Sequence, residues 1–336
     1  MLDIIIPSYN DEPGLYLTLL SLGVLEDIEH KVYIVDDCSP NKIDYDSIIE
    51  LFSRFHPIEL IQLDENQGPG MARQTGFDKS SGDLVVFIDC GDEVTNTTFL
   101  KQYVTLMRNN QKVDMIAAPH FEERPNYEVD MALNIHNRMH GKIYRRSFLE
   151  KYGIKFVPEC SRANEDIGFN VLCRLVLEHY NPEGLVPVEN PFICWRMDMN
   201  SIVRRDNGAF YFKEQNIGLA KNAEYVISSL LKIPDFPQEI VLKYMYEVLV
   251  SLYVFFSHTY YDRPEFIKDS LRGARHFYDL YFHVIDINSP FFVHLLNRAI
   301  KEEYYDERNP LAHQLNPLTF LDFIKMVEEV DNDQCE

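Results

Sequence analysis

The stretch at residues 84–93 has the strongest potential for chemistry in this 336-residue chain. Five apolar residues, L-V-V-F-I, run directly into the acidic cluster D-C-G-D-E at residues 89–93. The apolar run is too short for a helix and too apolar for a solvated edge, so it predicts a buried strand of a parallel sheet. Ligands of open α/β sheets bind beyond such strands, where Asp89 and Asp92 could hold a divalent metal or a sugar hydroxyl. An ordinary polar turn is the alternative.

Three further strand ends carry polar groups of a matching kind. Residues 7–10, P-S-Y-N, offer an aromatic face beside polar tips, and Asp36 with Asp37 offers acceptors for a base N–H or a ribose. Residues 66–70, N-Q-G-P-G, form a turn into a helix, with the cation Arg73 one turn later. Such a turn suits the close approach of a phosphate or a ribose. Together the four strand ends could form a nucleotide pocket, although each alone is common in α/β domains.

Alternating strands and helices must position these groups. Strands are predicted at residues 2–6, 32–35, 58–63, 84–88, 114–118 and 191–197. Helical patterns occupy residues 11–25, 48–55, 71–77, 96–110 and 167–179. This order predicts an α/β fold with a parallel, doubly wound sheet. Pro7 cannot donate to a ladder and should end the first strand, and Asn164 should cap the helix at 167–179.

Long helical patterns replace the strands from Phe210 onward. They occupy residues 214–231, 238–256, 264–282, 291–304 and 317–330. The chain is therefore expected to divide into an α/β domain at 1–207 and an all-helical domain at 208–336. Residues 244–256 carry large apolar side chains on most of the helix circumference, which predicts burial on more than one side.

Composition narrows the functional class. Lys and Arg total 32 against 53 Asp and Glu, and the resulting net charge of −21 argues against a broad nucleic-acid-binding surface. The six cysteines form no C-x-x-C pair, as expected for reduced thiols in a cytoplasmic protein. Neither a signal peptide nor a transmembrane segment is expected, because the first strand begins at Leu2 and the most apolar window, 240–256, contains Lys243 and Glu247.

In order and spacing, these motifs resemble the family-2 glycosyltransferases with the GT-A fold. The matching blocks are I-I-I-P-S-Y-N, V-D-D-C-S, N-Q-G-P-G-M-A-R-Q-T-G, F-I-D-C-G-D, H-G-K-I-Y-R-R-S-F-L, N-E-D-I-G-F-N and W-R-M-D-M-N-S-I. The resemblance implies a Rossmann-like, mostly parallel sheet flanked by helices that binds a nucleotide-diphosphate sugar. It does not extend into the helical part that follows Phe210.

The resemblance also implies which residues surround the nucleotide. These are Pro7, Tyr9, Asn10, Asp36, Asp37, Asn66, Gly68, Arg73, Asp89 and Cys90. Tyr9 should lie by the base, and Asp37 or its neighbour should accept a hydrogen bond from the base. Arg73 should approach the base or the phosphates.

The metal motif of the family is altered in this chain. Asp89 matches the first acid of the D-x-D motif, which is expected near the ribose and a Mg²⁺ or Mn²⁺ ion. Gly91 stands in place of the second acid and cannot ligate through a side chain. Either Asp92 reaches the metal, or metal binding is weakened, or Asp92 is a turn acid that faces solvent.

Two later blocks add candidates on the diphosphate side. His140 stands where the family usually has an aromatic residue, and it could contact phosphate or sugar, supply a third metal ligand, or be a packing substitution. Lys142 is expected to be an exposed cation or to face the diphosphate. Trp195, Arg196 and Ser201 match a segment that closes over the diphosphate, with the cation stabilising the departing charge.

Glu165 and Asp166 match the acidic pair that supplies the catalytic base in the family. A carboxylate suits this role because it must accept the proton of the acceptor hydroxyl as that oxygen attacks the anomeric carbon. The start of a helix favours the ionised carboxylate. Simple helix capping by acids is the alternative.

The resemblance thus implies an inverting, hexosyltransferase-type glycosyltransferase of class EC 2.4 that uses a nucleotide-diphosphate sugar, with UDP as the expected nucleotide. A nucleotidyltransferase of similar fold and a non-catalytic nucleotide-sugar-binding protein are the alternatives. The acceptor stays open among a glycan, a protein, a small molecule and a hydroxylated nucleic-acid base. The helical domain is expected to border the acceptor side, to form a homodimer contact, or to be a structural lid.

Overall fold

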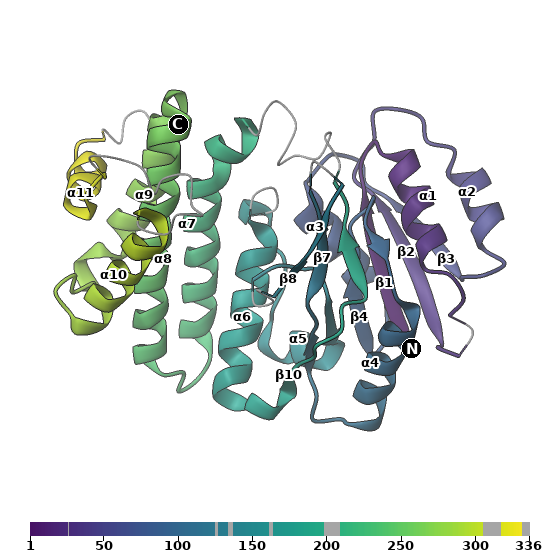
Figure 1. Ribbon diagram of the computed structural model, residues 1–336. Coiled ribbons are helices and arrows are strands. Elements are labelled where there is room, and N and C mark those ends of the chain that lie inside the picture. Colours follow the sequence, from purple (N-terminus) through teal and green to yellow (C-terminus); the bar gives the residue numbers. More distant parts are fainter. Residues whose placement is uncertain are drawn as a thin grey trace. The chain divides into compact units, whose positions relative to one another are not determined.

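The computed structural model describes residues 1–25, 27–124, 127–133, 137–160, 164–197, 209–304 and 317–330. The chain forms two compact units, Met1–Asp198 and Met199–Glu336 (Figure 1). The domain boundary expected at residue 207 lies outside the described residues.

A seven-stranded sheet with the order β10-β6-β9-β4-β1-β2-β3 forms the centre of the first unit (Figure 1). Its strands are β1 (Leu2–Ser8), β2 (His30–Asp36), β3 (Ile58–Gln62), β4 (Leu84–Phe87), β6 (Met115–Ala117), β9 (Lys142–Arg145) and β10 (Leu185–Pro187). Each described pair is parallel except the two that β9 makes with β4 and β6. The expected mostly parallel sheet is therefore confirmed, with one reversed strand that the sequence patterns did not reveal.

A second sheet of four short strands has the order β5-β11-β7-β8. It consists of β5 (Glu93–Val94), β7 (His120–Glu123), β8 (Val129–Ala132) and β11 (Ile193–Trp195). Only β11 was expected from the sequence. The missed strand β7 reads H-F-E-E. Its polar side chains are buried because His120 pairs with Glu122 and Glu123 pairs with Arg196, which a hydrophobicity pattern does not detect.

Helices cover the large sheet of the first unit. They are α1 (Glu12–Ser21), α2 (Tyr45–Phe52), α3 (Pro69–Lys79), α4 (Thr97–Asn109), α5 (Arg146–Tyr152) and α6 (Glu165–Tyr180). Helix α3 lies very close to β1, since a Cβ atom added at Gly76 would come within 2.5 Å of the Ile5 side chain. Glycine at this position therefore lets α3 pack directly against β1 and β2.

Strand β1 continues through Pro7 to Ser8, so the expectation that Pro7 ends it is wrong. The β1–β4 pairing stops at Ile5, where the Ile88 N–H donates to the Ile5 carbonyl. Because alternate residues of a strand hydrogen-bond to opposite sides, Pro7 faces the β4 side, beyond the last paired residue. Its missing N–H removes no ladder bond there, while Ser8 remains paired with β2.

Helix α6 begins directly after Asn164, as expected, but Asn164 does not cap it with its side chain. The residue has a left-handed backbone with φ 57°, and no capping hydrogen bond from its side chain is formed. Instead, the negative charges of Glu165 and Asp166 in the first turn stabilise the start of the helix.

The second unit is helical throughout its described residues. Its helices are α7 (Ala209–Lys232), α8 (Gln238–Asp262), α9 (Ile267–Tyr281), α10 (Pro290–Tyr304) and α11 (Phe320–Glu328). Aromatic side chains of α8, α9, α10 and α11 form much of its core, among them Phe256, Phe277, Phe292 and Phe323. By length and apolarity α8 passes as a membrane-spanning segment, yet 61% of its most apolar window is buried within the protein. A buried core helix has the same properties.

Candidate active site

The turn after β4 presents two carboxylates from one short segment. Gly91 has φ 95°, a conformation that L side chains rarely adopt, so an acid at this position would strain the backbone. The turn is closed by the Asp92 N–H, which donates to the Asp89 carbonyl at 3.0 Å. Asp92 is buried and Asp89 half-buried. The turn therefore brings Asp92, rather than the residue at position 91, beside Asp89.

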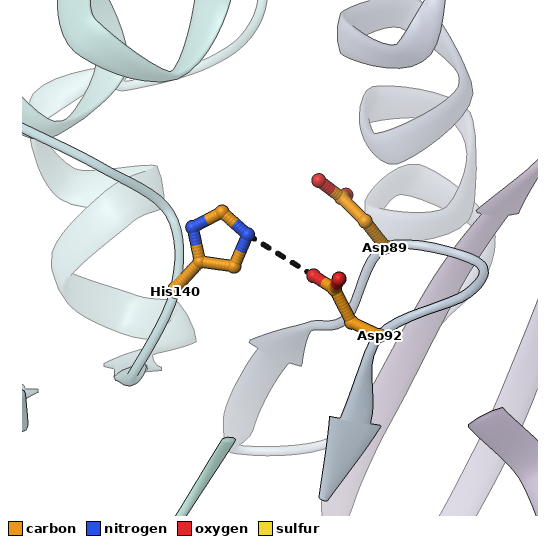
Figure 2. A group of neighbouring side chains, drawn as sticks. All are labelled: Asp89, Asp92 and His140. Atoms are coloured by element: carbon orange, nitrogen blue, oxygen red, sulfur yellow. Dashed lines mark ion pairs between the residues drawn. The ribbon is translucent and has the colours of Figure 1, made fainter. Parts of the chain in front are cut away.

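His140 completes a cluster with these two carboxylates (Figure 2). The ligand atoms of Asp89, Asp92 and His140 all lie within 4.8 Å of one another, and His140 Nε2 lies 3.0 Å from Asp92 Oδ2. The neighbouring Gly141 has φ 73°, and a Cβ atom there would meet the Ala118 carbonyl at 2.4 Å. Glycine thus lets this loop pack against the end of β6 and hold His140 over the acidic turn.

The cluster has the donor set and the unused bonding capacity that a divalent cation requires. The Asp92–His140 contact lacks hydrogen-bond geometry, and Asp92 Oδ2 and both His140 ring nitrogens are buried without such a bond. Burial raises the pKa of the Asp92 carboxyl, and the opposing effect of His140 is smaller. Burial lowers the pKa of His140, but Asp92, Asp89 and Asp166 together outweigh burial and raise that pKa overall. Two carboxylates and an imidazole fit Mg²⁺ or Mn²⁺.

Two aromatic rings hold the His140 imidazole from its sides. His120 of β7 stacks on it at a centroid distance of 4.9 Å, and Trp195 of β11 lies 5.7 Å away. His120 is itself held by Glu122, whose carboxylate lies 3.2 Å from His120 Nε2. The small second sheet therefore supplies the wall behind His140.

Arg73 is a buried cation between two acids of the site. Its guanidinium donates to Asp89 Oδ1 at 2.6 Å and to Glu165 Oε1 at 2.6 Å, and its side chain is 3% exposed. Partial burial raises the pKa of Asp89, but Arg73 outweighs burial and lowers it. Burial raises the pKa of Glu165 to about 7, against the opposing effect of Arg73. Arg73 thus bridges α3, the acidic turn and α6. Its expected approach to the base or the phosphates stays a prediction.

Asp37 shapes the turn that opens α3. Its two carboxylate oxygens accept the N–H groups of Gln67 at 2.7 Å and Gly68 at 2.8 Å, and its carbonyl accepts from the Asn66 side chain. Gly68 has φ 89°, which only glycine adopts readily. The predicted residues Asp37, Asn66 and Gly68 are thus brought together, with the Asp37 carboxylate already holding backbone donors.

Asp36 is buried and accepts from the Ser39 N–H, the Ser39 hydroxyl and the Gln62 side chain. Tyr9 lies at the carboxyl end of β1 with 45% of its side chain exposed, available to contact a ring. Asn10 next to it is exposed, and its N–H donates to Ser39 Oγ at 2.7 Å. These groups lie at the same edge of the sheet because β1 and β2 pair in parallel as far as Ser8.

Asp166 lies in the first turn of α6, on the other side of the loop that carries His140. Its Oδ2 accepts from the Met139 N–H at 3.3 Å, and the Asn170 side chain donates to its carbonyl at 2.8 Å. Lys142 is buried, so the expectation of an exposed cation is wrong. Burial lowers the pKa of Lys142 to about 7. Its ammonium donates to the Arg138 carbonyl instead of facing a solvated pocket.

The remaining predicted residues differ in their placement. Arg196 pairs with Glu93 at 2.9 Å and Glu123 at 3.2 Å, so two carboxylates already balance its charge. Cys90 donates to the Asp11 carbonyl, and burial raises the pKa of its thiol. Ser201 lies outside the described residues.

Several residues of the site were not found from the sequence. His120 lies in β7, Arg138 in the loop before β9 and Tyr144 in β9, and neither strand was predicted from the sequence patterns. Asn170 could have been found, because it follows Asp166 by four residues and therefore shares its face of α6.

Comparison with known proteins supports one family. Residues 3–166 match the model of glycosyl transferase family 2. An N-acetylglucosaminyltransferase of Rhizobium meliloti is 36% identical over 89 residues, which are 26% of this chain and 21% of that protein. Poly(ribitol-phosphate) beta-N-acetylglucosaminyltransferase TarS of Staphylococcus aureus is 25% identical over 178 residues, 49% of this chain and 31% of that protein. The chain thus spans less than a third of the length of these two relatives.

A similar fold is present in solved structures. The crystal structure of S. aureus TarS 1-349 in complex with UDP superposes with a TM-score of 0.56 at 16% identity, covering 91% of this chain and 93% of that one. The matched family region contains Tyr9, Asp37, Arg73, the acidic turn and Asp166. The mostly parallel sheet, the order of these residues and the family match agree. Residues 3–166 of the first unit therefore form a glycosyl transferase family 2 domain, and this unit has the GT-A fold.

Proposed function

We propose that this protein is an inverting glycosyltransferase that transfers a sugar from a UDP-sugar to an acceptor hydroxyl. The observation that carries the proposal is the position of Asp166 beside the loop that bears His140, since the Met139 N–H donates to Asp166 Oδ2. His140 in turn joins Asp89 and Asp92. A candidate base and a candidate diphosphate site therefore flank one short loop.

Asp166 takes the role of general base in this proposal. Its carboxylate accepts the proton of the acceptor hydroxyl while the hydroxyl oxygen forms a bond to the anomeric carbon. The bond from that carbon to the diphosphate oxygen breaks on the opposite face, and UDP leaves with the electron pair. Glu165 is tied to Arg73 at 2.6 Å and is therefore assigned to holding the site rather than to proton transfer.

Asp89, Asp92 and His140 are the residues that would hold Mg²⁺ or Mn²⁺. When bound, such a cation neutralises the charge of the departing diphosphate. Arg73 keeps Asp89 ionised, and the rings of His120 and Trp195 orient His140. Tyr9, exposed at the end of β1, is assigned to the base.

UDP-N-acetylglucosamine is the first donor to test. Two of the relatives are named as N-acetylglucosaminyltransferases, and the structure with a similar fold holds UDP. A protein that only binds a nucleotide sugar would need no general base. Here the carboxylate of Asp166 lies next to the loop that carries His140. The acceptor remains to be identified by product analysis.

Asp166→Asn tests the base assignment. The variant should bind UDP-N-acetylglucosamine with an affinity within about twofold of wild type and lose about 100-fold or more of UDP release, because only the proton acceptor is removed. Asp46→Asn, at an exposed position of α2, is the matched control and should keep full activity. Wild-type rates in Asp166→Asn would remove Asp166 from the mechanism.

We also propose that the helical unit contributes a homodimer contact. Large apolar side chains remain exposed on it, including Leu231 of α7 and Leu321 of α11. Light scattering at micromolar concentration tests the proposal, and a monomeric mass would refute it. If the unit contributes to acceptor binding instead, acceptor analogues should stabilise it against thermal unfolding.

A further inference from the structure

Lys142 is a buried lysine that the proposed chemistry does not use directly. It lies at the start of β9, its residue is 1% exposed, and it ranks among the largest fully buried side chains. Among the described residues, no carboxylate forms an ion pair with it. Burying an amine is costly, and a methionine would fill the same space without that cost. We therefore expect the ammonium group of Lys142 to have a role in the site.

The hydrogen bond of Lys142 leads to Asp166 through one peptide group. The Lys142 Nζ donates to the carbonyl of Arg138, and the N–H of the same peptide, on Met139, donates to Asp166 Oδ2 at 3.3 Å. The carbonyl and the N–H of a peptide point in opposite directions in one plane. An amine that holds the carbonyl end therefore also sets the direction of the N–H end.

A second connection runs from the same strand to the same acid. Tyr144 lies two residues after Lys142, so its side chain leaves the same face of β9. Its hydroxyl lies 2.6 Å from Asn170 Oδ1, and the Asn170 amide donates to the Asp166 carbonyl at 2.8 Å. The Tyr144 hydroxyl also lies 3.3 Å from the Met139 sulfur. Strand β9 thus reaches Asp166 at both its carboxylate and its backbone.

From this geometry we infer that Lys142 is a positioning residue for Asp166, acting through the Arg138–Met139 peptide, with Tyr144 and Asn170 as the second support. The inference rests on the proposed function, because it assigns to Lys142 the orientation of the proposed base. His140 is held separately, by Asp92 and by the rings of His120 and Trp195. Loss of the Lys142 amine should therefore affect the base more than the donor site.

Lys142→Met tests this inference because it keeps the length and volume of the side chain. Hydrogen exchange of the Met139 amide should become about tenfold faster or more, while amides of β1 and β2 keep their rates. The kcat for UDP release from UDP-N-acetylglucosamine should fall about tenfold or more, with the KM for the donor within about twofold. Lys42→Met, at an exposed position, is the matched control and should change neither quantity.

Tyr144→Phe is the second variant, because it removes only the hydroxyl of the other support. Tyr144→Phe should lower kcat by a smaller factor than Lys142→Met does, again with an unchanged KM for the donor. It also provides a test if Lys142→Met does not fold. Wild-type kcat in a folded Lys142→Met variant, or in Tyr144→Phe if the former does not fold, would overturn the inference. A wild-type protein that neither binds nor cleaves a UDP-sugar would instead refute the proposed function, and the exchange rate of the Met139 amide would still report on the peptide link.

Discussion

Replacing Arg73 with methionine should destabilise the first unit strongly. Arg73 is 3% exposed and holds two carboxylates at 2.6 Å each, those of Asp89 and Glu165. Removing one partner of a buried ion pair costs about 3–5 kcal/mol, because the other charge stays buried without compensation. Asp89 is half-buried and can be rehydrated. Glu165 is only 12% exposed, but burial already raises its pKa to about 7, so it can take up a proton once Arg73 is removed. We therefore expect the lower part of that range, about 3 kcal/mol.

Trp195 makes this prediction straightforward to measure. It is the only tryptophan in the chain, and it belongs to the first unit, so its fluorescence reports the unfolding of that unit in urea. Arg298→Met is the control, since Arg298 lies exposed on α10 in a pair with Glu302 one helical turn away. Such a pair contributes at most about 0.5 kcal/mol, and its removal should leave the Trp195 transition unchanged.

The double variant Arg73→Met with Glu165→Gln separates the charge effect from the packing effect. If the unpaired Glu165 carboxylate causes the loss, the neutral amide should restore about 1 kcal/mol or more. A loss below about 1 kcal/mol in the single variant would refute the reasoning from burial. If such a stable variant no longer bound UDP, the phosphate contact expected from the sequence would be the better assignment for Arg73.

Two further predictions concern protonation and metal binding. Burial, together with His30, holds the pKa of His56 at about 4 against the usual 6.5, so the folded protein binds fewer protons and loses stability as the pH falls from 6.5 towards 4. At pH 5 the free energy of unfolding, measured in urea, should be about 2 kcal/mol lower than at neutral pH. His56→Gln should remove this part of the pH dependence. An unchanged dependence of stability on pH in that variant would contradict the assignment. Mn²⁺ should strengthen UDP binding about tenfold or more in titration calorimetry, and EDTA should reverse this. His140→Ala should lose the Mn²⁺-dependent part only, and an equal response to Mn²⁺ would remove His140 from the ligand set.

The strands that could be predicted are those whose signal is local. The run at 84–88 and the runs that became β1 and β2 are apolar because each is buried on both faces of a parallel sheet. Strand β3, at the edge of the sheet, is only partly buried, and its apolar residues Ile58, Leu60 and Ile61 gave its signal. Strand β9 was not predicted because Lys142 and Arg145 occupy it. Arg145 is buried by partners far away in the sequence, such as Asp114 and the Met107 carbonyl, and Lys142 by a carbonyl of the preceding loop. Short strands stabilised by charge pairs carry no alternating pattern.

The ligands of the metal motif could be predicted from the sequence only in part. The sequence showed that Gly91 could not act as a ligand through a side chain, and it left two roles open for Asp92, a metal ligand and a turn acid that faces solvent. The positive φ of Gly91 and the contact between Asp92 and His140 place Asp92 in the cluster. For His140 the sequence left open a contact with phosphate or sugar, a metal-ligand role and a packing role, and its position with ligand atoms within 4.8 Å of those of both acids favours the metal-ligand role.

By itself the sequence determined the order of strands and helices, the family resemblance and the strand ends that carry polar groups, because short-range apolar patterns and motif spacing contain this information. Only the tertiary structure decided which charges meet. Arg73 pairs with acids 16 and 92 residues away, and the Met139 N–H donates to Asp166, which lies 27 residues further along the chain. No local pattern encodes such partners, because the free energy of a charged group depends on its burial and on the groups that the whole fold places around it.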